Sequence, residues 1–185
     1  MHIFLGFAPW IVFWILSGND SFFEAILVAG IVALLLSASR FIKGKIKLLE
    51  IGSLIFFALM TVAAFAADPP WLEKWTHVLG NAALTVIALV SVLVGKPFTL
   101  QYAKEQVAPE IWEKPGFFTT NLHITLVWCA CFVLQTVSSA LTITWPHHET
   151  WFSWIIPTAS FVAAIKFTAW YPEYRRAKYG QAPAQ

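Results

Sequence analysis

The sequence predicts an all-α fold: a polytopic membrane protein with a bundle of six transmembrane helices and one cytoplasmic interfacial segment between the fourth and fifth helices. Hydrophobic residues make up 58% of the 185 residues and charged residues only 12%, about half the charged fraction of soluble domains. The mean hydropathy is +0.68, and long apolar runs follow one another along the chain. Because backbone polar groups inside lipid must be satisfied within the segment, each run is expected to be a helix.

The six apolar runs define the predicted spans and leave one transmembrane domain over residues 1–185. The spans cover residues 3–17, 22–39, 51–67, 75–95, 118–144 and 151–171. The first run is short for a hydrocarbon core of about 30 Å at a rise of about 1.5 Å per residue. It begins without a basic leader region, so we expect a retained span and not a removed signal peptide. A turn at 18–20, a basic connector at 40–47 and the sequence Asp68-Pro69-Pro70 separate the first four spans.

The loops predict the orientation. Of the 12 lysines and arginines, ten lie in segments on one side of this topology, Lys74 lies on the other side, and Lys166 lies within the sixth span. Positively charged loops remain in the cytoplasm. Both termini and the segment 95–116 are therefore expected to be cytoplasmic.

The segment 95–116 is the longest polar stretch of the chain. Three lysines and three glutamates make it neutral, which is unlike a polybasic lipid-binding patch. Pro97 and Pro109 leave room for a helix of two or three turns over residues 98–107. The segment is expected either to lie flat at the membrane interface or to dock a partner. The candidate docking residues are Gln101, Tyr102, Lys104, Glu105 and Trp112.

Polar side chains also recur within the fourth and fifth spans at helical spacing, so that each set falls on one face. The candidate residues are His77, Asn81, Thr85, Asn121, Thr125, Gln135 and Ser139. Polar groups in a bilayer are costly unless they have partners, so we expect these faces to meet in a seam between the third, fourth and fifth spans. Two interpretations stay open. The seam is either hydrogen-bonded contact between helices or a polar cavity for a small molecule or lipid headgroup.

Catalytic and cofactor functions find little support. The sequence has no phosphate-binding loop, dinucleotide fingerprint, HExxH motif or serine triad arrangement. His77 and His123 fall at opposite ends of their spans and cannot ligate one haem. A cluster of His77, His147, His148 and Glu149 is a minor alternative as a metal site. We therefore predict no enzyme activity, no cofactor, no metal and no nucleic-acid partner.

Several short motifs resemble one family. They are the sequence FLGFAPWIVFW at 4–14, the basic connector, Lys-Trp-Thr at 74–76, Lys96-Pro97, Ile-Trp-Glu-Lys at 111–114, Asn121-Leu122 and Trp128. In this order they resemble the intracellular septation protein A family, the YciB-type inner-membrane-spanning proteins of bacteria. The resemblance covers most of the chain and implies a bacterial inner-membrane protein of envelope maintenance and division. It implies contacts with membrane lipids and other membrane proteins, and it carries over no catalytic residues.

Two functional hypotheses follow from these observations. In the first, the bundle is a scaffold that anchors a cytoplasmic docking surface at 95–116. In the second, the polar seam is the substrate cavity of a small transporter or lipid-binding protein. The sequence shows no internal repeat, and many transporter folds have one, which favours the scaffold.

Overall fold

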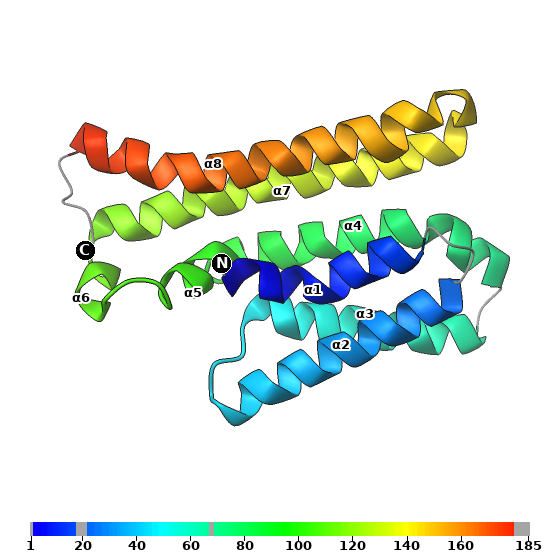
Figure 1. The fold of residues 1–185 in the computed structure, drawn as a ribbon, viewed down its shortest axis with the longest axis horizontal. Helices are drawn as coiled ribbons and strands as arrows, with labels where there is room; N and C mark the ends of the chain where they lie inside the picture. The colour runs from blue at the N-terminus through cyan, green and yellow to red at the C-terminus, as the bar shows by residue number, and fades with distance from the viewer. Residues whose placement is uncertain (1, 18–21, 67–68, 180–185) are drawn as a thin grey trace. The chain divides into compact units, whose positions relative to one another are not determined.

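A computed structural model describes residues 2–17, 22–66 and 69–179, and these residues form helices and their connections without any strand (Figure 1). Five helices in this part of the chain are long and apolar enough to cross a membrane: Phe22–Ile42, Leu48–Ala66, Pro70–Leu93, Gly116–Thr144 and Thr150–Lys178. The prediction of an all-helical fold is thus confirmed for the described residues, and the five apolar helices are compatible with several membrane spans. The remaining apolar helix, α1 (His2–Leu16), has only 15 residues, so its role as a sixth span stays a prediction.

The chain forms two compact units, residues 1–87 and 88–185. The N-terminal unit holds α1, α2 (Phe22–Ile42), α3 (Leu48–Ala66) and most of α4 (Pro69–Leu93). Buried alanines recur on α2 at every fourth position, at Ala25, Ala29 and Ala33. Small side chains let helix backbones approach closely where no hydrophobic effect drives association. In keeping with this, α2 packs against both α1 and α3.

Aromatic side chains fill the space between α1 and α3. Trp10 is fully buried, and its ring stacks on Phe56 with 4.9 Å between ring centroids and lies 5.0 Å from Phe57. Its indole Nε1–H donates a hydrogen bond of 2.7 Å to Ser53 Oγ. Burying the indole therefore leaves no donor unsatisfied, which a buried tryptophan requires.

A glycine of α3, Gly52, lies directly against the side chain of Ile87 on α4. A Cβ atom added at Gly52 would lie 2.5 Å from Cγ1 and 2.6 Å from Cδ1 of Ile87, closer than real carbon atoms approach. By contrast, a Cβ at Gly30 would meet its nearest neighbour, Phe57 Cβ, at 3.7 Å, which is ordinary contact.

Gly52→Ala is therefore expected to destabilise the N-terminal unit by about 1 to 2 kcal/mol, because overpacking exceeds the gain in helix propensity. Thermal unfolding in detergent measures the change. Gly30→Ala is the matched control and should leave the melting temperature unchanged or slightly raised. Adding Ile87→Ala to Gly52→Ala should remove the clash, and a double variant no better than the sum of its singles would contradict the packing argument.

The C-terminal unit begins with the last residues of α4. It continues with two short helices, α5 (Phe98–Ala103) and α6 (Pro109–Trp112), and the long α7 (Pro115–Thr144). After α7 come a 3-10 turn, η1 (Pro146–His148), a π-helical segment, η2 (Thr150–Ile155), and α8 (Ile156–Tyr179). Helices α7 and α8 lie side by side and antiparallel as a long hairpin (Figure 1).

Several helix ends differ from the predicted spans, and three of these differences involve proline. Helix α4 begins at Pro69 instead of 75, because a proline in the first turn removes an amide that has no partner there. Helix α7 likewise begins at Pro115 instead of 118. Helix α8 runs through Pro172 to Tyr179 instead of ending at 171, and Tyr174, just past the proline, stacks on Trp170 with 4.9 Å between ring centroids. Helix α2 runs to Ile42 and includes the start of the basic connector.

The predicted helix over residues 98–107 is wrong in length. Helix α5 ends at Ala103 and is followed by a turn, and the separate α6 covers residues 109–112. After Ala103 the amides of Glu105 and Gln106 bond to the carbonyls three residues back, so the α-helical pattern gives way to a turn. Pro109 then holds Ala108 extended, with ψ 147°. The predicted turn at 18–20 and Asp68 lie outside the described residues.

Candidate functional site: polar contacts in the two units

The segment 95–116 is held against α7 by hydrogen bonds of the Thr99 hydroxyl. Thr99 Oγ1 donates to the carbonyl of Asn121 at 2.8 Å and lies 2.7 Å from Thr125 Oγ1. Since Thr99 has one hydroxyl proton, Thr125 is the donor in the second bond. All three residues are buried. Helix α5 is thus docked on α7 by polar contacts and does not lie free at an interface.

The connection from α4 into α5 is also closed by hydrogen bonds. Gly95 adopts a left-handed φ of 68°, and the amide of Lys96 bonds to the carbonyl of Ser91 at 2.9 Å, a helix-ending pattern that glycine favours. The Ser91 hydroxyl oxygen accepts a hydrogen bond of 3.0 Å from the amide of Phe98. The backbone therefore enters α5 with a defined direction.

The candidate docking residues fall on different sides of this segment. Tyr102 is only 1% exposed, so it cannot be presented to a partner, and its inclusion in the docking surface is corrected. It recurs four residues after the buried Phe98, on the side of α5 that packs inward. Glu105 and Trp112 are exposed and Lys104 is half-buried. The Lys104 ammonium lies 5.0 Å from the centre of the Trp112 ring, and Gln101 Nε2 donates to the carbonyl of Lys96 at 3.0 Å.

Polar side chains join α7 to η2 and α8 along the length of the hairpin. The contacts run from the turn towards the C-terminus in antiparallel order: Ser138 Oγ to the carbonyl of Phe152 (2.7 Å), Gln135 Nε2 to Ser160 Oγ (3.4 Å), Trp128 Nε1 to Thr168 Oγ1 (3.0 Å) and His123 Nδ1 with Tyr171 Oη (2.5 Å). We call these four contacts the hairpin ladder. Each places a polar group of one helix against the other, so the hairpin is held by hydrogen bonds as well as by packing.

The predicted seam residues of the fifth span find partners inside the C-terminal unit. Gln135 bonds to α8 and lies 3.3 Å from Cys131 Sγ. Thr125 bonds to α5, and Asn121 Nδ2 donates to the carbonyl of Phe117 at 2.8 Å. Ser139 is half-buried. These partners on α5 and α8 were not foreseen, because the polar pattern of one helix does not show which neighbour it meets.

The predicted seam residues of the fourth span lie in the N-terminal unit. The His77 ring lies 6.1 Å from the ring of Phe13 on α1. Asn81 is buried, and Thr85 Oγ1 donates to its carbonyl at 2.9 Å. A seam shared by the fourth and fifth spans stays a prediction.

Two buried charged residues, Lys47 and Glu50, were not identified by the sequence analysis. Glu50, in the first turn of α3, is 4% exposed. One carboxylate oxygen lies 3.6 Å from Arg40 Nε on α2, and the other accepts the amide of Lys47 at 3.2 Å. Ser37 Oγ donates to the carbonyl of the same glutamate at 3.3 Å. A glutamate three residues after the residue that caps a helix is the signal that could have found it.

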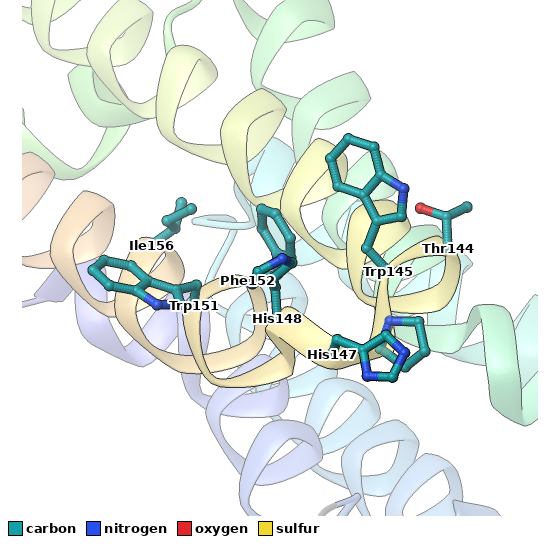
Figure 2. Close-up of a pocket in the computed structure, with 8 residues that line it drawn as sticks. Thr144, Trp145, His147, His148, Trp151, Phe152 and Ile156 are labelled. Carbon is teal, nitrogen blue, oxygen red and sulfur yellow. The ribbon is translucent and has the colours of Figure 1, made fainter.

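The turn between α7 and α8 carries an open cleft of about 760 Å³. Its walls are Thr144, Trp145, Pro146, His147, His148, Trp151, Phe152 and Ile156 (Figure 2). The described part of the chain holds no group of three or more histidine, cysteine, aspartate or glutamate side chains that could hold a metal ion. The minor alternative of a metal site at His77, His147, His148 and Glu149 therefore has no support in the structure.

The five long apolar helices are compatible with a multi-pass membrane protein. No family model, curated protein or solved structure matches it. The likeness to the septation family therefore rests on the sequence motifs alone.

Proposed function

We propose that the protein is a non-enzymatic scaffold of the bacterial inner membrane that acts in envelope maintenance or division through contacts with other membrane proteins. One observation carries the proposal. The polar groups of α7 that would have lined a substrate cavity bond instead to their own helix, to α5 and to α8. A polar face whose side chains bond within the protein contributes to helix packing. We therefore assign the function to the exposed surface.

The segment 95–116 is the proposed docking surface. Positively charged loops favour a cytoplasmic location for it, with both chain termini on the same side. Lys104, Glu105 and Trp112 are its accessible candidates, and the anchoring of α5 to α7 gives them a fixed position. A rigid surface binds a partner at lower entropic cost than a flexible loop.

The double substitution Lys104→Ala with Glu105→Ala tests the proposal. Expression and melting temperature should stay near wild type, while co-purification of division or envelope membrane proteins on the tagged chain should fall severalfold, because charges at the edge of an interface control association and register. Glu73→Ala with Lys74→Ala is the matched control. It removes a neighbouring, exposed pair of the same charges at the other end of α4 and should leave the interactions unchanged.

Gln135→Leu separates the scaffold from a transporter or lipid-binding protein. In a scaffold it should only lower stability by about 1 kcal/mol, the value of interhelical hydrogen bonds in membranes. An unchanged interaction profile in the Lys104/Glu105 variant, together with loss of uptake or lipid transfer in Gln135→Leu at unchanged stability, would overturn the scaffold in favour of the second hypothesis.

A further inference from the structure

The open cleft at the turn between α7 and α8, here called the turn cleft, shares no residue with the docking segment and adjoins the hairpin ladder at Phe152. Its volume of about 760 Å³ is within the range of roughly 300–1,000 Å³ found for small-molecule sites. Figure 2 shows Trp145 and Trp151 on opposite sides, with Phe152 and His148 between them. The Phe152 ring lies 6.3 Å from that of Trp145 and 6.4 Å from that of His148.

A π-helical segment of the backbone, η2, shapes the turn cleft. Residues of η2 form a π-helix, in which each turn holds one more residue than in an α-helix. Ile156 therefore recurs beneath Trp151, five residues earlier, and both line the cleft. Segments of this kind are frequent at functional sites.

The polar groups of the turn cleft are chiefly donors. The imidazoles of His147 and His148 each carry at least one N–H, and the indoles of Trp145 and Trp151 each carry one. No carboxylate lines the cleft. Its floor is apolar, with Phe152 and Ile156. The complementary ligand is thus an amphipathic molecule whose head is rich in hydrogen-bond acceptors.

If α8 spans a membrane, its length puts the turn cleft at the membrane surface. Trp151 and Trp170 are 58% and 53% exposed, and their positions differ by 19 residues, which corresponds to at most about 29 Å at the α-helical rise, because the first turn is π-helical. This matches the hydrocarbon thickness of about 30 Å. Tryptophans favour the two membrane–water boundaries, so Trp170 at one boundary sets the turn cleft at the other, level with lipid phosphate and ester groups.

We propose that the turn cleft binds one glycerophospholipid of the surrounding leaflet. The lipid phosphate and ester oxygens accept hydrogen bonds from His147, His148 and the two indoles. The start of an acyl chain lies against Phe152 and Ile156. The site goes beyond the proposed scaffold function and does not depend on it.

Native mass spectrometry of the full chain in detergent, titrated with phosphatidylglycerol, tests the site. The double variant His147→Phe with His148→Phe keeps the aromatic bulk but removes the donors, and it should weaken the tightest-bound lipid about tenfold. Trp151→Phe removes one donor and should weaken it about threefold. Trp154→Phe is the matched control, since Trp154 lies on the same π-helix, is exposed and does not line the cleft, and it should bind as wild type. Equal melting temperatures establish that all variants are folded.

Competition with glycerol 3-phosphate separates a lipid from a soluble phosphate compound. It lacks acyl chains and should not displace the lipid at equal concentration. Displacement would overturn the assignment to a phospholipid. Unchanged lipid affinity in the double histidine variant, or an equal loss in Trp151→Phe and Trp154→Phe, would overturn the site itself.

Discussion

Trp10→Ala is expected to lower the free energy of unfolding of the N-terminal unit by about 3 to 5 kcal/mol, the range for truncating a buried tryptophan. The side chain is fully buried, stacked on Phe56 and in contact with Phe57. Its removal leaves a cavity between α1 and α3 and takes away the donor to Ser53 Oγ. Thermal or chemical unfolding in detergent micelles, followed by circular dichroism, measures the loss.

Trp10→Phe separates the two contributions. It keeps an aromatic ring in the stack but removes the indole N–H, so the expected loss is about 1 to 2 kcal/mol. Trp154→Ala, at a position 70% exposed, should leave the melting temperature near wild type. If Trp10→Ala had the same melting temperature as Trp154→Ala, the aromatic core would not be what stabilises the unit.

Glu50→Ala is expected to destabilise the turn between α2 and α3 by about 3 kcal/mol, because removing one partner leaves the other charge poorly solvated. The carboxylate contacts Arg40 Nε and the amide of Lys47, and the variant loses both contacts. Hydrogen exchange of the α3 amides should become faster, and the melting temperature should fall.

Two further variants control this result. Glu24 also lies in the first turn of its helix but is exposed, so Glu24→Ala should cost no more than about 0.5 kcal/mol. Arg40→Leu combined with Glu50→Leu replaces the pair with apolar groups and should recover much of the loss. A Glu50→Ala protein as stable as Glu24→Ala would show that the buried contact contributes nothing to the turn.

The sequence predicted the helices well because apolar runs dictate them in lipid, whatever their neighbours. Helix ends were less predictable. Pro69 and Pro115 lie outside the predicted spans, yet each occupies a first turn, where its missing amide costs nothing. Pro172 lies inside α8, and the rings of Trp170 and Tyr174, on either side of it in the sequence, stack on each other. Proline marks a constraint, and its position within the helix decides the effect.

Contacts between helices were the least predictable part. The sequence identified Gln135 and Thr125 as polar groups that need partners, but it could not show that one bonds to α8 and the other to α5. Glu50 was not singled out, since charge alone does not reveal burial. Tyr102 was included among the docking residues because the pattern of the predicted helix over 98–107 does not show which of its faces packs inward.

The hairpin ladder has a consequence for how the chain enters a membrane during synthesis. Alone in lipid, α7 would present the side chains of Gln135, Trp128 and His123 without the partners that α8 supplies. The two helices are consecutive and joined by a short turn. The ribosome adds about 5 to 20 residues per second, so the partner residues on α8 are synthesised within seconds of α7. The hairpin can therefore leave the insertion machinery as one piece, with its polar groups already matched before it meets the rest of the protein.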